Sequence, residues 1–406
     1  SVLSKGADIL RQLDDEVESI YTNWYLYELG LAWDRHLANE KLLEKWQISG
    51  VPHQYDFYEK EVRTRLSLKQ TKRVFVIISD ALRFEIANEL GAIINNEKRF
   101  KAEVSTQLGV LPSYTQLGMA ALLPHQHIDY SSNGNTVTVD GMSSAGLENR
   151  STILAKVGGV AISAKSLLTW TRAEANQAIE DARVVYIYHD VIDAIGDKAA
   201  TELQTFKAAR QAINELNALV AKIINGFGVT RVVITADHGF LSQMTSPEDG
   251  VKSSLLTEPS GALECKKRYL LGRNLPENEN VWHGQIREMV MGDSDMEFWL
   301  PRGVSRFHFV GGARFVHGGA MLQEICVPVL EVQELRGKKQ LQNEKTKVNV
   351  VPVQSSIKLV NAIDKIRFLQ TDAVGERHKA RSLRLYIVDK NNLTVSAVEK
   401  VILDSS

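Results

Sequence analysis

The sequence predicts an α/β protein whose core is a mostly parallel sheet with helices on both faces. Three apolar, β-branched runs carry this prediction: RVFVIISD (73–80), RVVYIYHD (183–190) and GVTRVVITADHGF (228–240). Helical patterns follow the first two runs, and strands buried on both faces lose the alternation of polar and apolar residues. All three runs end in acidic or histidine residues, and ligands of such sheets gather beyond the carboxyl ends of the strands.

Three further segments flank or interrupt this core. Residues 1–70 are predicted to form an N-terminal helical linker or docking segment, because apolar residues recur there at three- and four-residue steps. The α/β domain is predicted to span 71–338, with a polar, irregular insertion at 241–305. Short alternating runs predict a small all-β sandwich domain over 339–406. Since the first residue is Ser, we expect the chain to be part of a longer polypeptide.

The composition predicts a soluble, cytoplasmic, globular protein. The chain has 406 residues, of which 44% are hydrophobic and 24% charged, which excludes wholesale disorder. The net charge of −1 provides no global basic field for nucleic acid. Two cysteines, Cys265 and Cys326, are too few for a disulfide scaffold or a cysteine zinc ribbon. The apolar runs are shorter than the ~20 residues that a membrane span requires.

Carboxylates and imidazoles gather at or after the predicted strand ends, as a two-metal site requires. His189 and Asp193 are four residues apart, so one helical turn would place them on the same side. Such ligands suit zinc, with manganese or magnesium as alternatives. The candidate ligands are Asp80, His189, Asp193, Asp237, His238 and His317.

Five phrases are characteristic when they occur in this order: SDALRFE, LPSYTQLGMAALLP, YHDVIDAIGD, TADHGF and VHGGAMLQEICVPV. Together they resemble the alkaline phosphatase superfamily, and more closely the PglZ domain of bacterial phage-exclusion (BREX) systems. The resemblance covers roughly residues 70–335. It implies an alkaline phosphatase-like fold, metal-dependent phosphoester hydrolysis, and other BREX defence proteins as partners.

The resemblance also implies two metal ions and a threonine nucleophile. It assigns Asp80, Thr115, Asp237 and His238 to one ion, and His189, Asp193 and His317 to the other. Members of the wider superfamily more often have Asp before His where this chain has His189 before Asp193. A metal would activate the Thr115 hydroxyl for attack on phosphorus, and water would then hydrolyse the phosphothreonine.

The segment around Thr115 leaves alternatives open. Thr115 follows Pro112, a good helix-start residue, so its hydroxyl is predicted to lie in a first helical turn, where free amides favour phosphate. Ser113 competes with Thr115 as the nucleophile, and it is also a candidate for substrate binding. Arg83, shortly after Asp80, could steady a substrate oxygen, with an exposed charge or a salt bridge as the alternative.

Other conspicuous residues receive structural interpretations. Trp24 and Trp33 are predicted to form a helix-packing stripe rather than a base-stacking platform. His189 could be a core histidine, with Asp190 as a competing carboxylate. His125 and His127 have ligand-like spacing, but a solvated loop is the simpler interpretation, and His283 and His308 have no assigned role.

The leading functional hypothesis is a hydrolase of phosphate monoesters or diesters, with nucleotides or nucleic acid among the candidate substrates. A sulfatase would need a C/S-x-P-x-R setting, which LPSYT and both cysteines lack. A phosphomutase would retain phosphate on Thr115. The alternative from another class is an interaction module of a defence complex with little or no catalysis.

Overall fold

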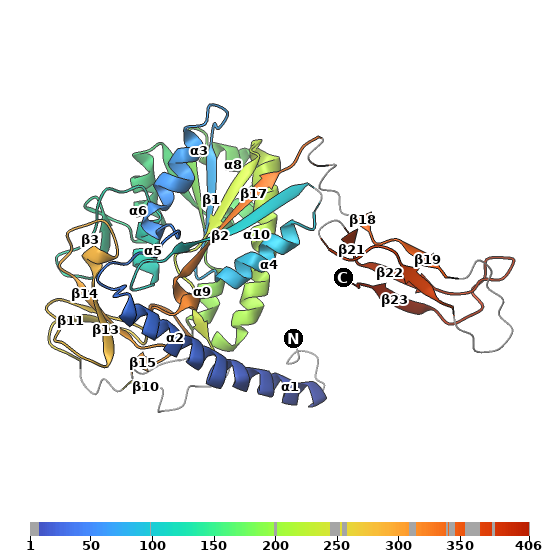
Figure 1. Cartoon of the computed structure of the whole chain (residues 1–406). Helices are drawn as coiled ribbons and strands as arrows, with labels where there is room; N and C mark the ends of the chain where they lie inside the picture. The colour runs from blue at the N-terminus through green and yellow to red at the C-terminus, as the bar shows by residue number, and fades with distance from the viewer. Residues whose placement is uncertain are drawn as a thin grey trace. The chain divides into compact units, whose positions relative to one another are not determined.

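The protein is represented by a computed structural model, shown in Figure 1. It describes residues 8–97, 99–198, 201–243, 252–253, 258–307, 314–337, 340, 346–353, 366–375 and 378–405. The chain divides into two compact units. The first comprises Ser1–Ile94 and Ala102–Gln333, and the second comprises Asn95–Lys101 and Glu334–Ser406.

The centre of the first unit is a six-stranded mixed sheet. Strand β1 pairs in parallel with β7 and β8, β6 pairs in parallel with β7, and β17 is antiparallel to β8. The predicted mostly parallel sheet is therefore confirmed, and the three predicted runs are β1, β7 and β8. In spatial order the strands are β2 (Phe100–Leu108), β17 (Cys326–Glu334), β8 (Arg231–Thr235), β1 (Val74–Ser79), β7 (Val184–His189) and β6 (Gly159–Ser163).

Helices cover both faces of this sheet. On one face, Val76 of β1 shares a buried apolar cluster with Leu117 and Ile153 from two helices. On the other face, the ring of Phe75 stacks on Phe227 with centroids 5.2 Å apart. Every residue of β1 is buried, which explains the unbroken apolar run in the sequence. The helices around the sheet are α4 (Phe84–Ile94), α5 (Thr115–Ala121), α6 (Gly146–Ala155), α7 (Ala164–Thr169), α8 (Arg172–Ala178), α9 (Val191–Gly196), α10 (Thr205–Phe227) and α11 (Leu322–Ile325).

The N-terminal segment is helical, as predicted, and much of it packs into the first unit. Leu37 and Phe57 belong to the main apolar core, and the Trp46 indole donates a hydrogen bond to the Gly109 carbonyl at 2.8 Å. The elements are α1 (Asp8–Ser19), a π-helical turn (Ile20–Tyr25), α2 (Leu26–Asn39), a 3₁₀ turn (Gln54–Asp56), a second π-helical turn (Tyr58–Arg63) and α3 (Thr64–Leu66).

The polar region expected to be irregular instead contains a four-stranded antiparallel sheet. Its order is β11 (Ala262–Cys265), β12 (Leu270–Gly272), β14 (Glu297–Pro301) and β13 (Val281–Gln285). Strands of three to five residues are too short to show a clear period in the sequence. Leu270 and Trp299 nevertheless build a separate apolar core beneath them.

Several short strands complete the first unit. They are β3 (Ile128–Tyr130), β4 (Val137–Val139), β5 (Met142–Ser143), β9 (Leu241–Ser242), β10 (Lys252–Ser253), β15 (Arg306–Phe307) and β16 (Phe315–Val316). The antiparallel pair β9–β16 matters for the site, because it ties the chain after β8 to the chain before His317. In the described part of the chain, no helix is both long and apolar enough to cross a bilayer.

The second unit contains the predicted C-terminal strands. They form three two-stranded pairings, β18 with β21, β19 with β20, and β22 with β23. Many of their apolar side chains, including Leu369 and Ile402, are exposed. The sandwich packing and the boundaries at 70 and 338 stay predictions. The strands are β18 (Thr346–Lys347), β19 (Val350–Pro352), β20 (Phe368–Gln370), β21 (His378–Lys379), β22 (Arg381–Leu385) and β23 (Glu399–Leu403).

Candidate metal centre

The first group of candidate ligands lies where β1 and β8 end. Asp80 directly follows β1, and Asp237 and His238 follow β8. The Asp237 Oδ1 atom accepts hydrogen bonds from the backbone amides of Ala81, at 3.1 Å, and His238, at 3.0 Å. Ala81 has φ of 58°, a left-handed conformation that strains any residue with a Cβ. The turn after Asp80 is therefore held in an uncommon shape by Asp237.

His238 turns its Nε2 atom toward this group. Its Nδ1 lies 2.9 Å from the Gly239 carbonyl oxygen, which can only accept, so Nδ1 carries the proton. Its Nε2 lies 3.1 Å from Thr115 Oγ1, 3.3 Å from Asp237 Oδ2 and 3.7 Å from Asp80 Oδ1. One aromatic nitrogen, two carboxylates and one hydroxyl thus converge.

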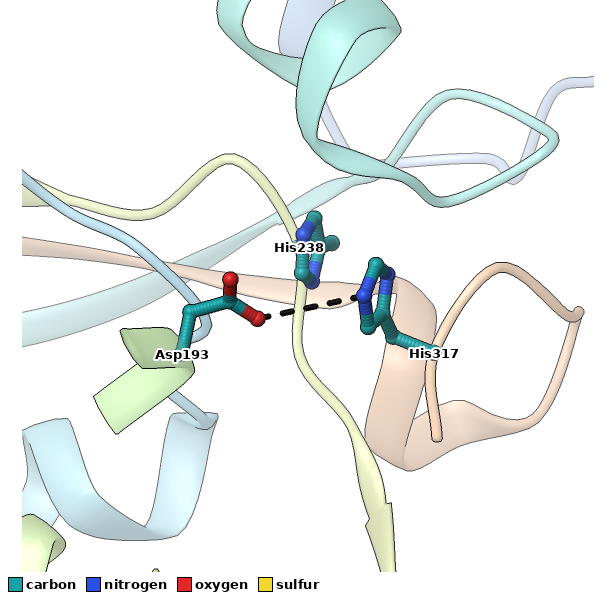
Figure 2. Close-up of side chains that lie close together, drawn as sticks. All are labelled: Asp193, His238 and His317. Atoms are coloured by element: carbon teal, nitrogen blue, oxygen red, sulfur yellow. Dashed lines mark ion pairs between the residues drawn. The ribbon is translucent and has the colours of Figure 1, made fainter. Parts of the chain in front are cut away.

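The second group adds Asp193 and His317 to the same imidazole (Figure 2). Asp193 is on α9, and His317 directly follows β16. The His317 Nε2 atom lies 3.8 Å from Asp193 Oδ1, and the His317 and His238 rings stack with centroids 4.2 Å apart. In each group one ligand atom per residue lies within 4.8 Å of the others. His238 therefore joins the two groups.

Burial and mutual repulsion shift the pKa values of the acidic groups. Burial, with the neighbouring Asp237 and Asp193 carboxylates, raises the pKa of Asp80 well above its usual range. Burial is also the main cause that raises the pKa of Asp193 to about 6. Burial and the adjacent His238 lower the pKa of His317. The folded site therefore disfavours the ionised forms of Asp80 and Asp193. A cation bound beside them would favour those ionised forms instead.

The donor set fits divalent cations. Asp80 Oδ1, Asp237 Oδ2 and Asp193 Oδ1 are buried and have no hydrogen-bond partner among the described residues. Unpaired buried carboxylate oxygens are strongly unfavourable unless a cation binds them. Carboxylate oxygens with imidazole nitrogens are the ligands of zinc, manganese and related ions.

Thr115 is brought to this centre by a close helix approach. It is the first residue of α5, and its partly buried hydroxyl faces His238. A Cβ added to Gly118 on this helix would lie 2.3 Å from the Asp237 carbonyl oxygen, so glycine allows the contact. The prediction that Thr115 lies in a first helical turn is confirmed. Pro112, however, lies before the helix and does not start it.

A cavity of about 380 Å³ opens beside Thr115, Asp193 and His317. Its lining is mostly polar and carries both signs of charge. The lining residues are Tyr114, Thr115, Gln116, Asp193, Asp197, Glu202, Glu264, Lys266, Lys267, Tyr269, Phe315, Val316 and His317. A phosphoester bound here would lie next to Thr115 and to Asp193 and His317 of the second group.

His189 is not brought into either group. It ends β7 rather than sharing a helical turn with Asp193, so the predicted common helix side is wrong. Its Nδ1 lies 2.9 Å from Ser79 Oγ, and its Nε2 lies 3.3 Å from Glu215 Oε2. Burial lowers its pKa, against the opposing influence of Glu215. The alternative of a core histidine describes this environment, although the buried Nε2 atom has no hydrogen-bond partner among the described residues.

Asp197 is a site residue that the sequence reasoning missed. It lines the cavity with Asp193 and His317, and its charge acts on the pKa of both. It follows Asp193 by four residues at the end of α9. The signal was available, because the spacing argument applied to His189 and Asp193 applies equally to Asp193 and Asp197.

The two predicted substrate-binding residues have other contacts. The Ser113 hydroxyl is buried and donates to the Gly319 carbonyl oxygen at 2.6 Å, so it fixes the loop after His317. Arg83 is buried, forms a salt bridge with Glu85 and lies over the Phe240 ring at 5.2 Å. The salt-bridge alternative for Arg83 is therefore confirmed, and its interpretation as an exposed charge is wrong.

The remaining histidines lie elsewhere. His125 contacts the Leu123 carbonyl oxygen, and His283 contacts Glu297 at 3.1 Å. His127 and Arg287 line a different hollow. His308 lies outside the described residues.

A buried ion pair holds the loop that carries His317. Arg268 and Glu324 are both fully buried, and two guanidinium nitrogens donate to the two carboxylate oxygens at 3.0 and 2.6 Å. The same oxygens accept from the backbone amides of Gly319, at 2.9 Å, and Met321, at 3.0 Å. Glu324 lies within an apolar run, and a buried glutamate is rarely found without a partner.

Gln54 holds the chain in place where β8 ends. Gln54 is completely buried, and its amide donates to the carbonyl oxygens of Ala236, at 3.1 Å, and Asp237, at 2.7 Å. Its carbonyl accepts from the Val110 amide at 3.0 Å. The N-terminal segment therefore positions a candidate ligand that is more than 180 residues away in the chain.

The family model for the BREX system PglZ alkaline phosphatase-like domain matches residues 57–332. The chain therefore belongs to this family of alkaline phosphatase-like proteins. It is 49% identical over 406 residues to the alkaline phosphatase-like protein BrxZ of Escherichia coli O9:H4 (strain HS), covering all of this chain and 47% of that protein. It is 37% identical over 404 residues to the alkaline phosphatase-like protein PglZ of Bacillus cereus (strain H3081.97), covering 98% of this chain and 46% of that protein.

The chain thus spans about half the length of the curated relatives it matches. Among solved structures it is similar to murine ectonucleotide pyrophosphatase/phosphodiesterase 5, with 12% identity and a TM-score of 0.45. That match covers 66% of this chain and 90% of the murine chain. At this level the likeness carries no functional argument, and the function has to be argued from the site.

Proposed function

We propose that this chain is a metal-dependent phosphoester hydrolase that works with other proteins of a bacterial BREX phage-defence system in the cytoplasm. One observation carries the proposal. Three buried carboxylate oxygens without hydrogen-bond partners among the described residues, on Asp80, Asp193 and Asp237, surround one imidazole beside an accessible hydroxyl. Family membership supports the same reaction class.

In this proposal two cations bind at the two groups, with zinc as the first candidate. Asp80, Asp237, His238 and Thr115 hold one of them. Asp193 and His317 hold the other, and the carboxylate of Asp197 takes the place of the His189 imidazole as the additional ligand on that side. When bound, the cations supply positive charge that favours the ionised hydroxyl and the developing charge on the phosphoryl oxygens.

The chain's own residues carry the covalent steps. Thr115 Oγ1 loses its proton to water and attacks phosphorus. The bond from phosphorus to the leaving oxygen breaks, and the alcohol departs after taking a proton from water. A second water then attacks the phosphothreonine, which breaks the bond between Oγ1 and phosphorus and restores the hydroxyl. The backbone contact of Gly118 keeps Thr115 against Asp237 throughout.

The test compares Thr115→Ala and Thr115→Ser with the unchanged chain. The substrates are bis(p-nitrophenyl) phosphate and p-nitrophenyl phosphate, with zinc or manganese, and the bound metal is counted separately by mass spectrometry. We expect Ala to lower kcat by roughly 10³-fold and Ser to retain measurable turnover. Equal turnover by Ala and the unchanged chain would reject Thr115 as the nucleophile.

The interaction-module alternative predicts a different outcome of the same experiment. If the unchanged chain binds its cations and turns over neither ester, catalysis is rejected and a scaffold role is favoured. Metal counting keeps this result separate from a preparation that simply lacks metal.

A further inference from the structure

The N-terminal helical rod has two apolar sides. One side packs on the first unit, where Leu26 shares a buried cluster with Leu241, Val304 and Met321. Trp33 also lies on this side, and its indole donates to the Ala320 carbonyl oxygen at 2.7 Å. The predicted packing role is therefore confirmed for Trp33. In Figure 1 the rod is the dark blue pair α1–α2.

The other side is apolar and exposed. Its six large side chains, which we call the outer stripe, are between 37 and 62% exposed, and Trp24 is the most exposed of them. Trp24 is therefore not packed, in contrast to the prediction. A helix that is apolar on opposite sides is normally covered on both. The outer stripe consists of Leu13, Val17, Ile20, Trp24, Tyr27 and Leu31.

The spacing of the outer stripe is that of a helix–helix seam. Its members follow one another at steps of four, three, four, three and four residues. In an α-helix, an alternation of three and four is the a/d pattern by which one helix packs along another. The π-helical turn Ile20–Tyr25 interrupts the rod, so this geometry applies separately to α1, through Leu13 and Val17, and to α2, through Tyr27 and Leu31. The spacing therefore indicates a helical partner rather than a strand or an irregular segment.

The acidic residues beside the outer stripe indicate which kind of helix would bind there. Residues 12–31 contain five acidic residues and no Lys or Arg, although the whole chain is almost balanced at 48 basic and 49 acidic residues. A second copy of the rod would bring Asp14, Glu16 and Glu28 close to the acidic residues of the other copy, and the repulsion between like charges is unfavourable. A helix with Lys or Arg beside its apolar seam would complement them.

The stripe runs into a hollow at its carboxyl end. Tyr27 and Leu31 line a cavity of about 380 Å³ together with Asp34, Arg35 and Ala38 of α2 and with residues 302–305, which include Arg302. A cavity at the end of an apolar seam accepts one large side chain, as anchoring residues of docked helices require.

We propose that the outer stripe docks an amphipathic helix of a partner protein, with an apolar seam flanked by Lys and Arg. This inference is independent of the proposed catalysis. The rod is held on the rest of the first unit through its inner side, and none of the six residues of the outer stripe lines the cavity beside Thr115.

Two synthetic helical peptides of about 21 residues test the proposal. Both carry the same Leu/Ile seam, one with Lys and the other with Glu at the flanking positions, and calorimetry measures their binding to the full chain. We expect the Lys peptide to bind at least roughly tenfold more tightly. Val17→Ser combined with Trp24→Ser should weaken that binding by a similar factor. Leu68→Ser, which changes an equally exposed residue elsewhere, should leave it unchanged.

A charge-reversed variant guards against misfolding of the serine variant. Asp14→Lys, Glu16→Lys and Glu28→Lys together should transfer the preference to the Glu peptide. Equal binding of both peptides, or binding of neither, overturns the proposal. Self-association of the chain that Trp24→Ser abolishes would instead assign the stripe to a second copy. Binding to phosphatidylcholine/phosphatidylglycerol vesicles that Trp24→Ser abolishes would assign it to a membrane surface.

Discussion

The two groups of candidate ligands share His238 but are built differently. Asp80 and Asp237 follow central strands, and the side chain of Asp237 is fully buried and hydrogen-bonded to two backbone amides. Asp193 and His317 lie on a short helix and a loop, with about a fifth of each side chain exposed. The strand-end group is therefore positioned by the sheet, while the loop group depends on contacts such as the Arg268–Glu324 pair. The difference predicts unequal responses to substitution.

The largest effect is expected for Asp237→Asn. The amide oxygen keeps the acceptor for Ala81 and His238, so the turn should survive while the negative charge is lost. We expect kcat/KM to fall by roughly 10³-fold and the bound metal at the strand-end group to disappear. Activity assays and metal counting check this, and near-normal activity would contradict the account.

Glu324→Ala should weaken the loop group indirectly, by removing the buried ion pair that holds the loop carrying His317. It leaves the Arg268 guanidinium and the amides of Gly319 and Met321 without their acceptors in a buried place. Breaking a buried ion pair costs about 3 kcal/mol or more. Thermal unfolding should show a clearly lower Tm, and metal should be lost first from the loop group. An unchanged Tm would show that the pair does not support the loop.

His317→Ala should impair metal binding at the loop group and leave the strand-end group intact. Only the loop group loses a ligand, so we expect one cation to remain and kcat/KM to fall roughly 100-fold. His189→Ala is the matched control, because that ring faces Ser79 and Glu215 and lies in neither group. Loss of one cation from the His189 variant, with none lost from the His317 variant, would reverse the assignment.

The smallest expected effect is the pH-dependent stability of the metal-free chain. Folding raises the pKa of Asp193 from 3.8 to about 6, so its stabilising contribution is complete below 3.8 and is lost as the pH rises to about 6. With chelator at pH 7.5, Asp193→Asn should therefore be more stable than the unchanged chain, on the order of 2 kcal/mol.

That advantage should shrink as the pH falls to about 4, and added zinc should reverse it. Thermal unfolding of both proteins with chelator and with zinc measures the effect. A variant that is less stable than the unchanged chain in chelator would mean that the Asp193 carboxylate is not repelled in the folded state.

Strand-end residues were predictable because their signal is local. Asp80 closes an unbroken apolar run, and the pair Asp237–His238 closes another, so parallel strands bring them to one edge. His317 ends no long apolar run, so its candidacy was weaker until the resemblance of VHGG to a family motif supported it. His189 was wrongly paired with Asp193 because a strand-to-helix junction separates them, and their sequence spacing does not show where the helix begins.

Contacts between distant segments could not be predicted. Arg268 and Glu324 are 56 residues apart, and Gln54 reaches Asp237 across 183 residues, so no local pattern connects them. The antiparallel sheet around Trp299 was likewise missed, because its stability comes from cross-strand packing of very short strands. Local patterns therefore predicted the sheet and the candidate ligands at its strand ends, while the supporting contacts required the tertiary structure.

The most direct test of the two-group account is anomalous scattering from a zinc-soaked crystal of the chain. We expect two zinc peaks roughly 4 Å apart. One would be coordinated by Asp80, Asp237 and His238, and the other by Asp193 and His317. A single peak, no peak, or a second zinc bound to His189 would contradict the account.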